Sequence, residues 1–165
     1  MSWTQLLAID PGMSTGVVWG VYSDTEPFKL EGRTQVEGGR DATRDFLEGQ
    51  FSTYTRVVCE KFRALPRVYK AVELEPLPIE GVVTTLFVDV VWQYPGAMTI
   101  GGAHGTPAKN KRAADDVLRR MGLWTTGSQI GFKDANDVNS AMKHVVAYLK
   151  GISHRPTLEA LGVEL

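Results

Sequence analysis

The sequence contains almost no cysteine and no long hydrophobic run. Its single cysteine, Cys59, excludes an internal disulfide and any metal site built from several cysteines, which favours a reducing compartment. The longest apolar stretch, residues 82–92, is too short to cross a membrane and contains Asp89. No basic segment followed by an apolar one opens the chain, so we expect neither export nor membrane insertion, and a cytoplasmic location.

The sequence also lacks an excess of positive charge. Its formal net charge is -1 at pH 7, which argues weakly against a nucleic-acid partner, because phosphate contacts usually accompany a basic excess. The distribution of charge matters more than the total. Residues 104–120 are locally basic, since their two acids, Asp115 and Asp116, are outnumbered by Lys109, Lys111, Arg112, Arg119 and Arg120.

Internal repeats, heptads and low-complexity tracts are absent, which excludes solenoids and coiled coils. The 165 residues, 43% hydrophobic and 22% charged, suit one globular domain. Hydrophobic periodicity and turn residues predict a three-strand meander, then alternating helices and strands, hence a mixed α/β sheet covered by helices. The expected strands are 6–9, 16–22, 28–36, 56–62 and 88–94, and the expected helices are 42–51 (capped by Asp41), 78–87, 108–121 and 134–149.

Two acids occupy unusual positions in or next to expected strands. Asp10 closes the apolar run 6–9 and precedes Pro11-Gly12, so it either projects into a cleft at the sheet edge or simply forms the turn. Glu60 lies in a mostly apolar, β-branched strand. A buried acid needs a partner or a metal, although pairing with a surface Lys or Arg is an equally good interpretation.

Two further acids, Asp134 and Asp137, are three residues apart where the last expected helix begins. Residues at this spacing are neighbours on a helix surface, so both carboxylates would face one way. Asp134 could instead cap the helix. A divalent cation would relieve their repulsion, and oxygen ligands of this kind select Mg²⁺ or Mn²⁺ rather than zinc.

Together these residues resemble a known family. Residues 7–12 with Thr15-Gly16 look like the first-strand motif of RuvC-like Holliday junction resolvases, which belong to the ribonuclease H-like superfamily. Residues 58–60 are similar to the glutamate motif of the family's fourth strand, and residues 134–137 to its last-helix acid pair. Phage-type members in particular are similar at Gly122-Leu123-Trp124, Asn136-Asp137, His144 and Tyr148-Leu149. The resemblance spans roughly residues 6–150.

The resemblance implies a ribonuclease H-like fold over residues 1–150, with a five-stranded mixed sheet, followed by a C-terminal tail at 151–165. It implies a homodimeric endonuclease that cuts four-way DNA junctions with two Mg²⁺ or Mn²⁺ ions per active site, leaves a 5′ phosphate, and needs no small-molecule cofactor. The location would be the host cytoplasm if the chain is phage-encoded. The implied metal ligands are Asp10, Glu60, Asp134 and Asp137.

The resemblance also implies DNA contacts. Phe62 would wedge at the crossover, Lys109 or Lys111 would stabilise charge on the phosphoryl oxygens, and Arg112 would contact DNA. Each has an ordinary alternative: Phe62 as a residue at the core edge, and the three basic residues as a solvated helix face. His144 either supports the acids from behind or is a hydrogen-bonded structural histidine.

Three other functions are compatible with the same residues. The first is a nuclease of this fold that acts on flaps, forks, single strands or structured RNA. The second is a nucleic-acid-binding module without catalysis. The third is a small ATPase, because an Ile-Asp-Pro-Gly string also resembles the sugar-kinase and actin superfamily, but those proteins are longer and duplicated.

Overall fold

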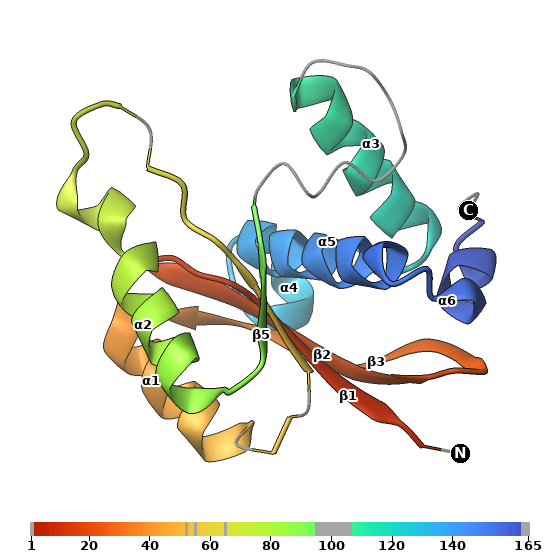
Figure 1. The fold of residues 1–165 in the computed structure, drawn as a ribbon. Helices are drawn as coiled ribbons and strands as arrows, with labels where there is room; N and C mark the ends of the chain where they lie inside the picture. The colour runs from red at the N-terminus through yellow and green to blue at the C-terminus, as the bar shows by residue number, and fades with distance from the viewer. Residues whose placement is uncertain (1, 52, 55, 65, 95–106, 163–165) are drawn as a thin grey trace.

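Five strands form one mixed sheet in the order β3-β2-β1-β4-β5 (Figure 1). The computed structural model describes residues 2–51, 53–54, 56–64, 66–94 and 107–162, with the backbone alone for 107–113. Neighbouring strands β1, β2 and β3 are antiparallel, whereas β4 runs parallel to β1 and β5 parallel to β4. The predicted fold class, a meander extended by parallel strands, is confirmed. The strands are β1 (Thr4–Asp10), β2 (Ser14–Ser23), β3 (Glu26–Glu37), β4 (Arg56–Glu60) and β5 (Val90–Gln93).

Helices cover both faces of the sheet (Figure 1). On one face lie α1 (Gly39–Gln50) and α2 (Pro76–Leu86), the latter preceded by a 3₁₀ turn at Ala71–Leu74. On the other lie α3 (Pro107–Arg120) and α5 (Asn136–Gly151), with the short α4 (Gly127–Ile130) between them in the chain. A last helix, α6 (Arg155–Ala160), packs against β3, so the segment expected as a tail contains regular structure.

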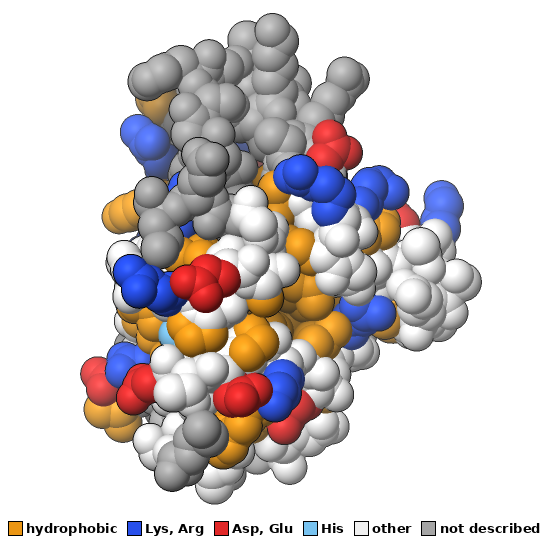
Figure 2. All heavy atoms as spheres, turned by 90° about the vertical axis from the view of Figure 1, so that its right-hand side faces the viewer, with side chains coloured by type: hydrophobic (Ala, Val, Ile, Leu, Met, Phe, Trp, Pro, Cys, Tyr) orange, Lys and Arg blue, Asp and Glu red, His pale blue; other side chains and the backbone are white. Residues whose placement is uncertain are grey.

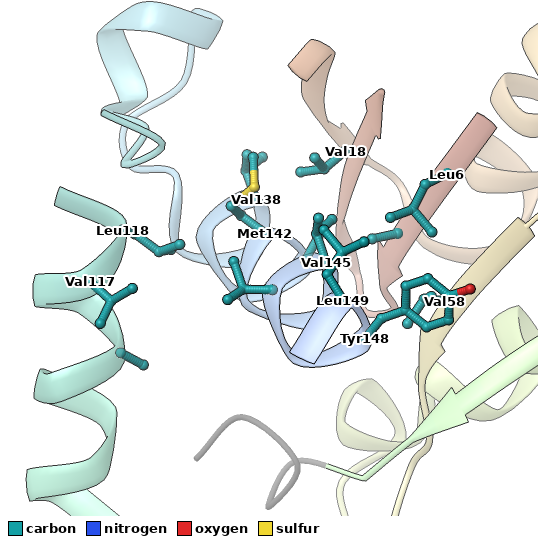
Figure 3. Packing of buried hydrophobic residues seen from close by; sticks show 14 of the residues in the cluster. Leu6, Val18, Val58, Val117, Leu118, Val138, Met142, Val145, Tyr148 and Leu149 are labelled. Carbon is teal, nitrogen blue, oxygen red and sulfur yellow. The ribbon is translucent and has the colours of Figure 1, made fainter. Parts of the chain in front are cut away.

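Each central strand supplies both cores, because alternate side chains point to opposite faces. On β1, Leu6 and Ala8 belong to the core under α5, while Leu7 and Ile9 belong to the core under α1 and α2. Figure 3 shows the first core, in which side chains of α5 fill the space between α3 and the sheet. Its labelled members are Leu6, Val18, Val58, Val117, Leu118, Val138, Met142, Val145, Tyr148 and Leu149.

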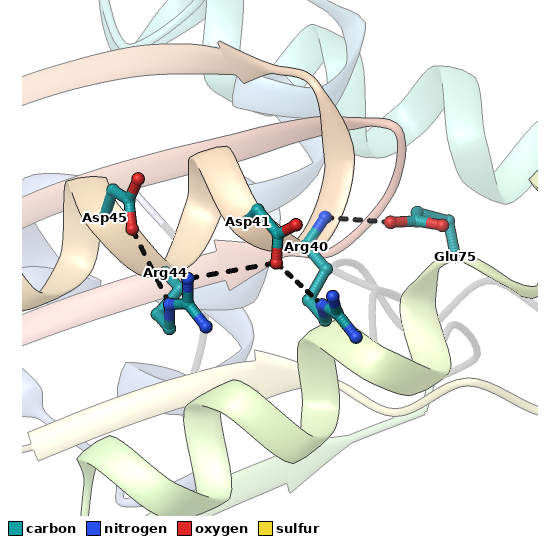
Figure 4. A network of polar contacts seen from close by, with 5 residues as sticks. All are labelled: Arg40, Asp41, Arg44, Asp45 and Glu75. Atoms are coloured by element: carbon teal, nitrogen blue, oxygen red, sulfur yellow. Dashed lines mark hydrogen bonds and ion pairs between the residues drawn. The ribbon is translucent and has the colours of Figure 1, made fainter.

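The N-terminus of α1 differs from the prediction. Asp41 is not the N-cap: the helix begins three residues earlier than expected, at Gly39, and its N-cap is Gly38, whose φ of 107° is in the left-handed region. Glu75 takes over the capping role, since its carboxylate accepts a hydrogen bond of 2.8 Å from the Arg40 backbone N–H (Figure 4). Asp41 instead pairs with Arg40 and Arg44 on the surface.

The predicted strand over 56–62 ends at Glu60, because a side chain takes over its hydrogen bonding. The Lys61 N–H still donates to the Gln93 carbonyl at 2.7 Å, but the Phe62 N–H donates to the buried Glu80 carboxylate of α2, which also pairs with the Lys61 ammonium. The helix α2, through Glu80, thus fixes the chain where it leaves β4.

No helix in the described part of the chain is long and apolar enough to span a membrane. Figure 2 shows the face on the right-hand side of Figure 1, where Lys and Arg side chains alternate with Asp and Glu, and hydrophobic side chains lie between them. The described charges on this face are therefore mixed in sign.

Candidate active site

Asp10 is the last residue of β1 and stands at the carboxyl end of the sheet's parallel half. The turn that follows is held by Thr15, whose hydroxyl donates to the Gly12 carbonyl at 2.9 Å and is itself approached by the Thr43 hydroxyl at 3.0 Å. The hydrogen bonds of this turn come from buried threonines.

Glu60 ends the neighbouring parallel strand. Cys59 of β4 pairs with Ile9 of β1, so the next residues of the two strands, Glu60 and Asp10, lie at the same end of the sheet. The Glu60 carboxylate accepts a hydrogen bond of 2.7 Å from His144 Nε2, and His144 Nδ1 lies 2.7 Å from Gln93 Oε1. The expected surface cation for Glu60 is replaced by a completely buried histidine.

Asp137 reaches the same end of the sheet from the first turn of α5. The helix start can lie this close because Gly16, the residue paired with Asp10 across β1 and β2, has no side chain. A Cβ on Gly16 would stand 2.0 Å from the Asp137 carbonyl oxygen, far inside van der Waals contact. The glycine of the Thr15-Gly16 motif thus brings the third carboxylate to the first.

The charges of the other two carboxylates act on Asp10. Burial raises its pKa well above the usual range, and the charges of Glu60 and Asp137 raise it further. A hydrogen bond from the Ser140 side chain and the charge of Lys143, both on α5, act in the opposite direction. The acids of β1, β4 and α5 are therefore close enough for the charges of Glu60 and Asp137 to act on Asp10.

Asp137 has a milder environment of the same kind. Burial raises its pKa above the usual range, and the charges of Asp134 and Glu37 act in the same direction. Asp134 lies two residues before α5, in an exposed loop, and accepts a 3.3 Å hydrogen bond from the Asn136 N–H. The expectation that α5 begins at Asp134 is wrong, although the two acids remain electrostatic neighbours.

Lys143 is a site residue that the sequence reasoning missed. Its side chain is 4% exposed and forms an ion pair with Asp115 of α3, and its charge also acts on Asp10. A lysine between buried Met142 and Val145 is an unusual choice, since lysine is almost never fully buried unless paired. From the sequence, the signal was a lysine in the middle of an apolar helix segment. Its burial became recognisable only once α3 was in place.

Of the residues predicted to contact DNA, the side chain of Phe62 is among those that the structure describes. Phe62 is half-buried just after β4 and packs edge-on against Tyr69, with ring centroids 5.8 Å apart, while the Arg67 guanidinium lies 4.5 Å from the centre of the Tyr69 ring. Lys109, Lys111 and Arg112 belong to α3 by their backbone, but their side chains lie outside the described residues.

Cys59 takes no part in this arrangement. Its side chain points to the opposite face of β4 from Glu60 and is fully buried, and burial together with nearby carboxylates raises the pKa of its thiol. A protonated, buried thiol is a poor nucleophile.

The donor chemistry of the site suits a hard divalent cation. Asp10 is a half-buried carboxyl on which the charges of Glu60 and Asp137 act, and carboxylate oxygens prefer Mg²⁺ or Mn²⁺ as ligands. Within the described residues, no group of three or more His, Cys, Asp or Glu side chains is arranged so that it could hold a metal ion. The fit to such a cation therefore lies in the chemistry of the donor atoms, and among the described residues these donors are not assembled into a ligand shell.

Neither a protein-family model nor a curated protein sequence matches the chain. Solved structures do. Thermus thermophilus RuvC in complex with a Holliday junction substrate has a TM-score of 0.59 at 12% identity, covering 93% of this chain and 97% of RuvC. The chain has the RuvC fold. A second structure of T. thermophilus RuvC has a TM-score of 0.57 at 13% identity, covering 92% and 98%.

The same fold extends to a viral protein. Fowlpox virus resolvase, solved in complex with its substrate Holliday junction DNA, has a TM-score of 0.51 at 14% identity, covering 88% of this chain and 99% of the resolvase. The RuvC-like, ribonuclease H-like architecture predicted from the motifs is confirmed, and it extends over nearly the whole of each chain compared.

Proposed function

We propose that this protein is a metal-dependent endonuclease that resolves Holliday junctions and other branched DNA. One observation carries the proposal: Asp10, Glu60 and Asp137, contributed by β1, β4 and α5, are electrostatic neighbours at the carboxyl end of the parallel strands of a RuvC fold. The RuvC and Fowlpox virus resolvase structures with this fold are complexes with Holliday junctions, which favours the four-way junction over flaps, forks, single strands or structured RNA.

In this proposal Asp10, Glu60 and Asp137, assisted by Asp134, hold two Mg²⁺ or Mn²⁺ ions. When bound, such ions supply an activated water as nucleophile and stabilise the leaving 3′ oxygen. The chain contributes the surroundings. Partial burial of Asp10 limits its contact with bulk water, and the Ser140 hydrogen bond favours the ionised form that a cation requires.

Basic residues near the acids would complete the chemistry. Lys109 and Lys111, on the first turns of α3, are proposed to stabilise negative charge on the phosphoryl oxygens, and Arg112 to contact DNA. Lys143 joins them as a cation tied to the same helix, because its partner Asp115 belongs to α3. The position of α3 relative to the acids would then depend on this ion pair.

The segment after β4 is the proposed contact with the junction itself. It follows Glu60 directly and combines the Phe62 and Tyr69 rings with the exposed side chains of Arg63, Arg67 and Lys70. Rings stack on unpaired bases and basic side chains neutralise phosphates, so this segment suits a crossover where bases are unstacked. Paired cleavage of a four-way junction further requires a homodimer, which we propose from the resemblance.

The test is cleavage of labelled four-way junction, three-way junction, flap, linear duplex and single strand, side by side, with Mg²⁺ or Mn²⁺. We expect four-way junctions to be cut best. Asp10→Asn or Glu60→Gln should lower cleavage by orders of magnitude while junction binding persists, and Asp45→Asn, at an exposed acid of α1, should cleave normally.

Retained cleavage in the Asp10 and Glu60 variants would refute the metal assignment. Preference for flaps or single strands would favour the alternative nuclease, and binding without any metal-dependent cleavage would favour a non-catalytic module. Sedimentation showing a strict monomer on junction DNA would exclude paired cleavage.

A further inference from the structure

A buried hydrogen-bonded chain joins β5, α5 and β4 beside the acids. His144 is completely buried, two turns after Asp137 on α5, and its two ring nitrogens contact Gln93 and Glu60 at 2.7 Å each. Gln93 and Glu60 are paired residues at the ends of β5 and β4. One imidazole ring therefore connects the final residues of two strands to the helix that carries Asp137.

Packing alone does not explain a histidine at this position. The neighbouring buried residues of α5 that face the sheet, such as Ala141 and Val145, are apolar and fill the core without polar atoms. A buried imidazole must satisfy its ring nitrogens, because an unpaired buried polar group costs about 1–3 kcal/mol. Both partners here are side chains at the active-site end of the sheet, so the polar atoms of His144 serve the site.

The contact also restricts Glu60. A glutamate has three rotatable side-chain bonds, and fixing them at the half-buried end of a strand costs conformational entropy. Because an ionised carboxylate only accepts hydrogen bonds, Nε2 donates to Glu60 Oε2. In the neutral imidazole Nδ1 then accepts, so the Gln93 amide, turned by half a rotation, presents its NH₂ group to the ring. The carboxylate has a second oxygen and further lone pairs, so this contact is compatible with coordination of a cation.

We propose that His144 is a positioning residue for Glu60: it holds the carboxylate in the orientation that binds metal, while Gln93 fixes the imidazole ring. The inference rests on the proposed function and deepens it. Hydrogen-bonding partners behind a metal ligand commonly contribute 10–100-fold to metal affinity or activity. His144 acts through Glu60, so its removal should weaken the metal site rather than the fold alone.

The test is Mn²⁺ binding by the full chain without DNA, measured by isothermal titration calorimetry and by the electron paramagnetic resonance of free Mn²⁺. Two conservative variants separate the ring nitrogens. The amide of His144→Gln can reach the position of Nε2 and still donate to Glu60, whereas His144→Asn reaches only the position of Nδ1. Glu60→Gln is the reference variant in which the ligand itself is lost.

We expect His144→Asn to weaken Mn²⁺ binding about 10–100-fold and His144→Gln to retain most of the wild-type affinity. Gln93→Leu, at a half-buried position of the edge strand, should give an intermediate loss. This variant also keeps the test decisive if His144→Asn does not fold.

Equal Mn²⁺ affinity in wild type, His144→Asn and Gln93→Leu would overturn the positioning role, and so would losses in which the Gln and Asn variants of His144 are indistinguishable. In both cases a response to Glu60→Gln would leave the proposed nuclease site intact. Wild-type protein that binds no Mn²⁺ would overturn the nuclease proposal and the inference together.

Discussion

Gly16→Ala offers a sharp test of how the acids are brought together. The added Cβ would lie 2.0 Å from the Asp137 carbonyl oxygen and 2.6 Å from the Val138 nitrogen. Ordinary carbon contacts are about 3.5–4.0 Å, so the first turn of α5 must move away by about 1.5 Å. All of the atoms in conflict are backbone atoms, which cannot turn aside as a flexible side chain can.

The displacement should affect stability and activity differently. Overpacking of this kind costs about 1–3 kcal/mol, which this domain can tolerate while folded. A shift of about 1 Å in an active site can cost 10²-fold in rate, and here the shift carries Asp137 away from Asp10. We therefore expect a folded protein whose junction cleavage has fallen by roughly 100-fold or more.

The assays are urea denaturation and single-turnover cleavage of a four-way junction. The matched control is Gly81→Ala on α2, where an added Cβ meets nothing within 4 Å. It should be stabilised by about 0.5–1 kcal/mol and cleave normally. Wild-type cleavage and stability in Gly16→Ala would refute the reasoning that the glycine admits α5 to the site.

Three further predictions concern single side chains. Because the pKa of Asp10 is raised, the metal-free folded chain binds the Asp10 carboxyl proton more tightly than the unfolded chain does. Thermal stability in EDTA should therefore fall as pH rises from the usual carboxyl range through the raised pKa. Asp10→Asn should flatten this pH profile and be more stable at neutral pH, and identical pH dependence in wild type and Asp10→Asn would contradict the argument. Lys143→Met should lower the unfolding free energy in urea by about 3–5 kcal/mol, since it leaves Asp115 partly buried without its partner, and adding Asp115→Leu should recover part of the loss. Phe62→Ala should weaken junction binding in Ca²⁺ gel shifts by about 1–3 kcal/mol if the ring stacks on a base; loss of thermal stability with unchanged binding would make Phe62 a core-edge residue.

Local patterns predicted the sheet and the positions of two acids. A continuous apolar run ends abruptly at Asp10, and an acid in an otherwise apolar strand marks Glu60, so both acids could be singled out from neighbouring residues alone. The end of β4 could not, because the apolar pattern continues to Phe62. The exact helix starts were less predictable. Asp134 has the composition of a first helical turn, but the chain enters α5 two residues later, and only three-dimensional packing decides this.

The contacts that complete the site depend on residues distant in the sequence. His144 meets Glu60 across 84 residues and Gln93 across 51, and no periodicity links them. Lys143 has an interpretable role only once α3 supplies Asp115. Gly16 was part of a recognised motif, but its reason, the approach of the α5 backbone, is visible only in the fold.

Because α5 carries several residues of the proposed site, their spacing along the helix constrains how the sequence can diverge. Ser140 and His144 lie three and seven residues after Asp137, which is close to one and two turns of a helix with 3.6 residues per turn. Substitutions elsewhere on this helix leave that phase untouched, whereas a one-residue insertion between Asp137 and His144 would rotate the histidine by about 100° away from Glu60. Selection would then preserve a spacing more strictly than a sequence, so distant descendants could drift far in residue identity and still retain the same helical phase.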